Sequence, residues 1–360
     1  MDTPKSLPKN TPHPRYFYMD AIRAFACLAI IMIHVSAEFA VQELGTIEFW
    51  FGNVFDSISR VGVPLFVMIS GALMLDEQYA YSMRKLKAHA FKLLCFYLFW
   101  SSAYALCFSV LSPLMKGKPI SFINVAWDIV HGYYHLWFIP MMIGVYLLLP
   151  LLRLWVRKAN MKQVEYFLLL ALLFAGFLPQ CFAILTCINP LFAKLNSLLE
   201  RLYMHYPVGF SAYFVLGWYL NNKEFSIKAS SYRIALALAS AVTILGTYLL
   251  FRYTHTEQYV FYDNFSLNIL VAAVAVFMLC KMRFSDAERI SRPARALISV
   301  ISKYSLGIYA IHAALFTFII RETADFHVML AIPVNFVVCA TLSLLTTYIL
   351  SKLPILKRFV

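Results

Sequence analysis

Apolar residues recur along this chain in runs long enough to cross a bilayer, with polar residues gathered between the runs. A transmembrane helix needs roughly 20 mostly apolar residues. We predict an all-α membrane protein with about ten such helices, at residues 17–40, 50–75, 89–111, 133–152, 164–186, 205–221, 232–251, 264–281, 300–320 and 328–351. Because ten is an even number, both termini are expected on the same side of the membrane.

The first apolar run carries several ionisable residues on one helical face. Arg23 and His34 lie 11 residues apart, which on an α-helix is about three turns and a rise of about 16 Å. Asp20 and Glu38 fall on the same face. A charge in hydrocarbon costs roughly 2.5–3.5 kcal/mol on insertion scales, so such residues usually line a working cavity. This face indicates chemistry or transport inside the bilayer.

The two carboxylates of this face have different interpretations. Glu38 follows His34 by one turn, so its carboxylate could fix the imidazole tautomer and raise its basicity, as in acid–base sites. Asp20 could instead cap the helix and offset the charge of Arg23.

The second run repeats the pattern with Asn53, Asp56, Ser57 and Arg60 at helical spacing. Arg60 is expected about 15 Å below the outer end of its helix, close to the depth of His34. Pro64 cannot donate a backbone hydrogen bond, so it predicts a kink beside Arg60. Asp56 could serve only to neutralise Arg60.

Two later segments place polar groups where a substrate could lie. His135 opens the fourth run on its outer side, and Ser302, Ser305, Tyr309 and His312 form a one-sided row in the ninth. Tyr309 and His312 could equally hydrogen-bond between helices, since such contacts commonly hold membrane bundles together.

Composition and charge agree with a polytopic protein. Of 360 residues, 61% are hydrophobic and 14% are charged, whereas soluble domains carry about 25% charged residues. The net charge is +13, and 23 of the 31 Lys and Arg residues fall at the ends and loops of one side, against six on the other. Basic loops favour the cytoplasm, so both termini are predicted there. Scattered in short loops, these residues do not indicate nucleic-acid binding.

Little else in the chain predicts a separate domain or a metal site. The first run has no cleavage signal and is expected to remain as a helix. We divide the chain into a cytoplasmic tail (1–16), a transmembrane domain (17–351) and a second tail (352–360). The seven cysteines lie mostly in apolar runs without C-x-x-C spacing and are interpreted as packing residues, although Cys181 and Cys187 could pair. The histidines lack metal-site spacing, so no metal is expected.

Four segments, in order, resemble motifs of the bacterial acyltransferase-3 family of membrane acyltransferases. They are DAIRA at 20–24 followed by His34, RVGVPLFVMISG at 60–71, HLWFIP at 135–140 and SLGIYAIH at 305–312. The resemblance covers about residues 16–351 and is greatest to stand-alone O-acetyltransferases of enterobacterial common antigen. One departure is Ser57, which stands where many members have a second arginine. Members that modify long polysaccharides often carry a fused extracytoplasmic domain; none is expected here.

The resemblance implies a multi-pass protein of the bacterial inner membrane that uses acetyl-CoA as acyl donor. Its partners would be membrane lipids and a sugar or lipid-linked glycan acceptor. The expected roles are catalysis by His34, Glu38 and Arg60, donor binding by Arg23 and Asp20, and acceptor binding by His135, Tyr309 and His312.

A different function class remains open at this point. A transporter or flippase could use Arg23, His34, Glu38 and Arg60 as a charge relay. A scaffold subunit without chemistry would leave the buried arginines unexplained.

Overall fold

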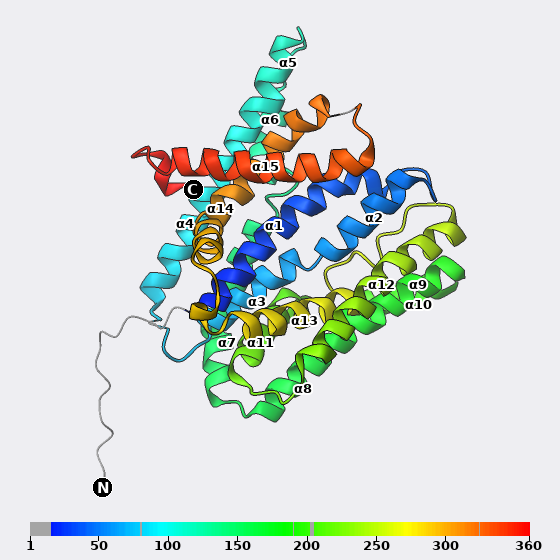
Figure 1. Ribbon diagram of the computed structural model, residues 1–360, viewed down its shortest axis with the longest axis vertical. Helices are drawn as coiled ribbons and strands as arrows, with labels where there is room; N and C mark the ends of the chain where they lie inside the picture. The colour runs from blue at the N-terminus through cyan, green and yellow to red at the C-terminus, as the bar shows by residue number, and fades with distance from the viewer. Residues whose placement is uncertain (1–15, 80, 190, 202–204, 324) are drawn as a thin grey trace.

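The computed structural model describes residues 16–79, 81–189, 191–201, 205–323 and 325–360. Regular structure in these ranges is entirely helical, and the helices pack as one bundle (Figure 1). Nine helical segments within them are long and apolar enough to cross a membrane. These are α1 (Phe17–Ala40), α2 with α3 (Ile47–Ser59, Gly62–Met74), α4 with α5 (Met83–Ala105, Ser112–Met115), α7 (Phe138–Lys158), α8 with α9 (Met161–Ala171, Leu178–Ile188), α12 (Ala229–Thr254), α13 (Leu267–Phe284), α14 (Arg292–Glu322) and α15 (Val328–Leu350).

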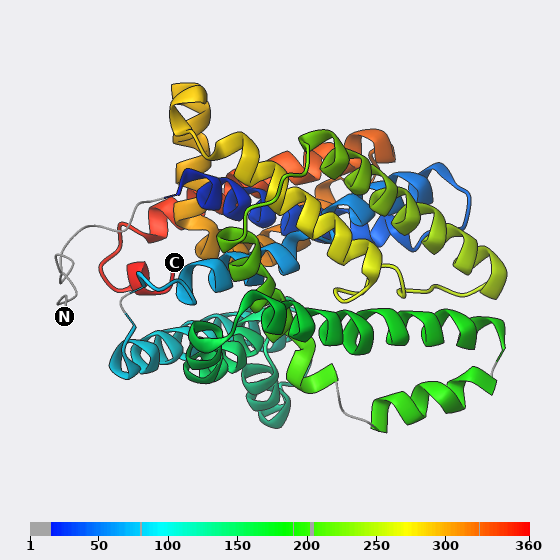
Figure 2. The same cartoon turned by 90° about the horizontal axis from the view of Figure 1, so that it is seen from below.

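The predicted span 205–221 is not among these nine; it corresponds to α11 (His205–Asn222), which is not a regular helix throughout. Gly209 has non-helical backbone angles, so the continuous helix begins after it. The remaining helices are α6 (Phe122–His131) and α10 (Leu191–Arg201), with 3₁₀ turns at Ala287–Arg289 and Leu356–Arg358. The start of α1 and the end of α15 lie at the same end of the bundle (Figure 2). Which side of the membrane that end faces stays a prediction.

Prolines account for three interruptions in the spans. The predicted kink near Pro64 is confirmed: α2 ends at Ser59 and α3 begins at Gly62. Single π-helical turns at Leu106–Leu111 and Leu172–Phe177 lie immediately before Pro113 and Pro179. A proline cannot donate to the carbonyl four residues earlier, and the wider turn accommodates the missing bond.

α1 lies at the centre of the bundle, where it contributes to three hydrophobic clusters. One is shared with α3, α7, α11 and α13, one with α14 and α15, and one with α4, α7 and α14. The backbones of α3 and α11 meet directly, because a Cβ added at Gly71 would overlap the Phe214 carbonyl and one at Gly217 the Met68 carbonyl. Small residues allow such close approach between membrane helices.

The chain's ends and cysteines complete the comparison with the sequence. The predicted tail 1–16 lies outside the described residues except for Tyr16. The last residues are not a free tail: Phe359 stacks on Phe99 with ring centroids 4.3 Å apart, and its carbonyl accepts a hydrogen bond from the Trp100 indole at 2.9 Å. All seven cysteines are free, so Cys181 and Cys187 do not pair.

Gly217→Ala should destabilise the protein, because the new methyl group would force α11 away from the Met68 carbonyl of α3. Overpacking of this kind costs about 1–3 kcal/mol, which thermal unfolding of the purified protein would detect. Gly144→Ala in α7 is the matched control, since a Cβ there meets no atom within 4 Å. Equal unfolding temperatures for the two variants would contradict the close contact.

Candidate active site

The register of α1 against α14 is set by hydrogen bonds between buried polar groups. The Ser302 hydroxyl donates to the Asp20 carboxylate at 2.7 Å, and the Cys27 thiol lies 3.8 Å from the Ser305 carbonyl oxygen. Residue numbers rise together on both helices, so the two run parallel. Asp20 lies inside the first turn of α1, whose N-cap residue is Tyr16, so Asp20 does not cap the helix as one interpretation suggested.

Further along the same contact between α1 and α14, three histidines come together. The ring centroid of His34 lies 5.1 Å from that of His312 and 6.4 Å from that of His135, and the latter two rings are 5.1 Å apart. The Tyr134 ring lies 5.2 Å from His34. His135 and His312 are almost completely buried. Across the described residues, no group of three His, Cys, Asp or Glu side chains is arranged to hold a metal ion.

Backbone carbonyls determine the tautomers of two of these rings. His312 Nδ1 lies 2.7 Å from the Tyr309 carbonyl oxygen, and His135 Nε2 lies 3.3 Å from the Ala310 carbonyl oxygen. A carbonyl only accepts, so each of these nitrogens carries the hydrogen. His312 Nε2 and His135 Nδ1 therefore keep their lone pairs, and both atoms are buried without a hydrogen-bond partner among the described residues. The cluster thus contains two unused acceptors.

His135 does not open a helix, as the predicted span 133–152 implied. It lies in a turn between α6 and α7, which begins at Phe138. Gly132 starts this turn with φ +80°, and a Cβ there would contact the Tyr97 ring. The Tyr309 hydroxyl donates to the His135 carbonyl, so Tyr309 holds the turn against α14.

Arg60 occupies the break between α2 and α3. It forms an ion pair with the fully buried Asp56, and its guanidinium carbon lies 4.4 Å from the centre of the Tyr262 ring. Asp56 Oδ1 and Arg60 Nε are buried without a hydrogen-bond partner among the described residues. Gly62, two residues after Arg60, packs against Ile30, one turn before His34 on α1. The sequence pattern did not indicate a role for Tyr262, because this residue lies in the loop before α13, outside any helical repeat.

Glu38 lies one turn beyond His34 on α1, and its side chain is exposed. Among the described residues, the rings that contact His34 are those of Tyr134, His135 and His312, and a role for Glu38 beside His34 stays a prediction. Spacing of one turn places two residues on one face, but it does not decide which neighbouring helix fills the space beside each of them.

Arg23 lies at the opposite end of the same helix face. Its side chain is about one-third exposed (33%), and a guanidinium nitrogen of Arg23 lies 4.0 Å from the carboxylate oxygen Oδ1 of Asp20. Tyr146 of α7 and Ser70 of α3 lie within reach of this end of α1. Polar groups of α1, α3 and α7 therefore continue inward from the histidines toward this end of the bundle.

Space for a small group exists beside His135. A cavity of about 150 Å³ is lined by Tyr104, Ser109, Asp128 and Tyr133, among others, and the Tyr104 ring lies 5.2 Å from that of His135.

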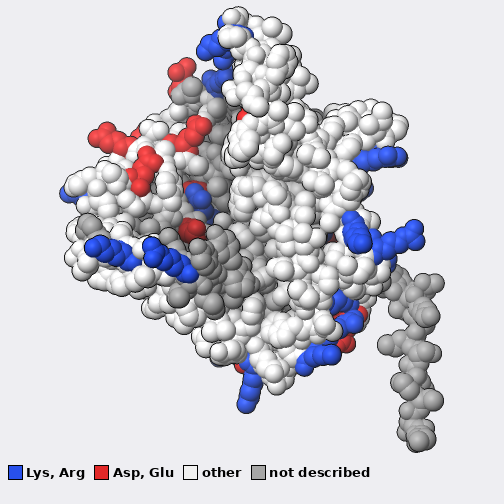
Figure 3. All heavy atoms as spheres, turned by 180° about the vertical axis from the view of Figure 1, so that it is seen from behind, with Lys and Arg blue, Asp and Glu red and all other residues white. Residues whose placement is uncertain are grey.

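The space-filling view shows a hollow on the back face, with acidic side chains gathered beside it and a basic side chain inside it (Figure 3). Larger cavities lie away from the histidines, around α8, α9, α11 and α13.

The fold and the site together define a multi-pass helical membrane protein with a histidine cluster and a half-buried arginine that is paired with a buried carboxylate. Residues 16–352 match the family model of the acyltransferase-3 family, described as an acyltransferase domain. This chain belongs to that family and is a membrane acyltransferase. No curated protein and no solved structure matches the chain.

Asp56→Ala should destabilise the protein by about 3 kcal/mol, the lower end for a buried pair, because it leaves the half-buried Arg60 charge without its partner. Thermal unfolding of the purified protein measures the change. Asp286→Ala is the control: its ion pair with Arg289 is exposed, and exposed pairs contribute only about 0–1 kcal/mol. A small and equal effect of both substitutions would mean that the Arg60 charge is compensated by other groups.

Proposed function

We propose that this protein transfers an acetyl group from cytoplasmic acetyl-CoA to a hydroxyl of a cell-surface sugar or glycolipid, such as enterobacterial common antigen. The observation that carries the proposal is the group of three histidines beside Arg60 within a membrane acyltransferase. The protein would work in the bacterial inner membrane with both termini in the cytoplasm, as the distribution of its basic residues favours.

The donor would enter from the end of the bundle that carries Arg23. Coenzyme A is anionic, so its phosphates favour a guanidinium at the mouth of its path. Arg23 is partly exposed, and Asp20 would orient it. The thioester arm would then follow the polar groups Ser70 and Tyr146 toward His34.

In the reaction, His34 acts as the general base. It takes the proton of the acceptor hydroxyl while that oxygen attacks the thioester carbonyl. Arg60 stabilises the negative charge that develops on the carbonyl oxygen, a contribution often worth about 3 kcal/mol in buried sites. The carbon–sulfur bond then breaks, and the protonated His34 returns its proton to the sulfur of the departing thiol.

The two unused lone pairs assist this chemistry. His312 Nε2 is positioned to accept a hydrogen bond from the His34 ring, which leaves the other His34 nitrogen as the base. We therefore assign to His312 the orienting role that the sequence suggested for Glu38. His135 Nδ1 is free to accept a hydrogen bond from the acceptor sugar.

His34→Ala should lower acetyl transfer by about 10²–10⁴-fold, the usual contribution of a positioned general base. The measurement is thiol release from acetyl-CoA together with acetylation of glycans, followed by mass spectrometry. His89→Ala is the control, because His89 is exposed on α4. Full activity of the His34 variant refutes the assignment, and substrate flux without thiol release would favour the transporter instead.

His312→Leu should reduce kcat by about 10²-fold with little change in KM, because the base loses its orienting partner while the binding surface remains. His312→Gln keeps an acceptor oxygen near the position of Nε2 and should restore part of the rate. A purely structural His312 would instead give equal rates for the two variants, with unfolding temperatures that fall in parallel.

A further inference from the structure

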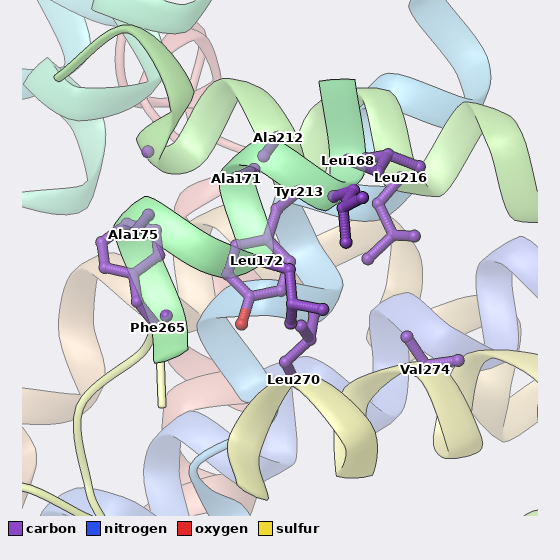
Figure 4. A pocket seen from close by; sticks show the side chains of 13 residues that line it. Leu168, Ala171, Leu172, Ala175, Ala212, Tyr213, Leu216, Phe265, Leu270 and Val274 are labelled. Atoms are coloured by element: carbon purple, nitrogen blue, oxygen red, sulfur yellow. The ribbon is translucent and has the colours of Figure 1, made fainter. Parts of the chain in front are cut away.

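A second site is indicated on the side of the bundle formed by α8, α11 and α13. A cavity of about 250 Å³ lies there, and its walls come from α8, the π-helical turn Leu172–Phe177, α11 and α13 (Figure 4). Its lining is apolar apart from Tyr213, whose hydroxyl is already used in a hydrogen bond to the Asn264 carbonyl at 2.5 Å. The cavity therefore offers only hydrocarbon and aromatic surface to an occupant.

Two departures from regular helix build this cavity. The π-helical turn carries Ala175 and Gly176, and α11 contributes Gly209 with its non-helical backbone. A Cβ added at Gly176 would lie 3.0 Å from the Phe265 carbonyl oxygen. π-helical turns occur frequently at functional sites, and here one of them faces a second irregularity across the same space.

A larger and more polar cavity adjoins the apolar one. The second cavity, of about 540 Å³, shares Ala175, Gly176 and Phe265 with the first. Its wall adds Asn196, Asp263 and Ser266, among others, and includes no Lys or Arg among the described residues. The Ser266 hydroxyl already donates to the Val260 and Asp263 carbonyls, so the Asp263 carboxylate is the group that offers acceptors to an occupant. A carboxylate without a basic neighbour disfavours a phosphate, whereas its oxygens accept hydrogen bonds from the hydroxyls of a sugar.

The membrane supplies the natural occupant of the apolar part. Only 11% of the apolar window of Met161–Ile188 is buried within the protein, so this span presents most of its surface to lipid. An apolar cavity of even about 150 Å³ stays free of water and takes up an apolar guest. A hydrocarbon chain from the bilayer meets both conditions.

Aromatic contacts connect this pair of cavities with the active site. Phe265 lies 4.7 Å from Phe210, which lies 5.9 Å from Trp137, two residues after His135. On the polar side, Tyr259 lies 6.5 Å from Tyr262, the ring beneath Arg60.

We propose that the two cavities bind a single-chain glycolipid, with its hydrocarbon chain in the apolar cavity and its sugar in the polar one. The site would bring a lipid-anchored acceptor from the bilayer toward His34. In naming the glycolipid as acceptor the inference rests on the proposed function, but binding at this site does not depend on acyl transfer.

Photo-crosslinking in phosphatidylcholine nanodiscs tests the site. The probe is an alkyl glycoside with a diazirine in its chain, and mass spectrometry identifies the labelled peptides. Labelling is expected in 168–176 and 209–216. Ala212→Leu fills the apolar cavity and should lower this labelling about tenfold. Ala235→Leu is the matched control, because Ala235 lines a separate apolar cavity beside α12.

Three results would overturn the inference. They are no labelling of these peptides in the wild-type protein, equal labelling in the Ala212 variant, and equal labelling by phosphatidylglycerol with the same diazirine. The wild-type result stands even if the variant fails to fold. Since no acyl donor is present, the outcome is independent of thiol release, so failure of the proposed enzyme activity is recognised separately.

Discussion

The parallel contact between α1 and α14 is the constraint on which the active site depends. The Asp20 carboxylate and the Ser302 hydroxyl are both buried and hydrogen-bond to each other, so each has a partner where α1 meets α14. From that bond the contact continues with the Cys27 thiol, which lies 3.8 Å from the Ser305 carbonyl oxygen. It then reaches His34 and His312, whose ring centroids lie 5.1 Å apart.

The features that could be predicted from the sequence are those that depend on the spacing of residues within one helix. Polar stripes on α1, α2 and α14 follow from the helical repeat, and the break beside Arg60 follows from Pro64, which lacks a backbone donor. The partner of His34 could not be read in the same way, since spacing favoured Glu38 on the same helix whereas the neighbour comes from α14. Tyr262 belongs to a loop whose path depends on tertiary packing.

Helix irregularities divide the protein into regions with different tasks. At the centre, the interruption between α2 and α3 positions Arg60 beside the histidines. At the lipid-facing side, the π-helical turn before Pro179 and the bend at Gly209 open apolar space instead. Between these regions, α3 and α11 touch through Gly71 and Gly217, so the two backbones form one rigid partition. Movement of a substrate past this partition would have to follow the aromatic side chains at its outer end.

The sequence distance between His34 and His312 has a consequence for biosynthesis. The two residues are separated by 278 positions, and a ribosome adds about 5–20 residues per second, so α1 waits on the order of tens of seconds for α14 to emerge. During that interval its carboxylate and imidazole lack their eventual neighbours. The nascent protein therefore depends on the insertion machinery, or on early contacts with α2 and α3, to keep the polar groups of α1 away from lipid until the chain is nearly complete.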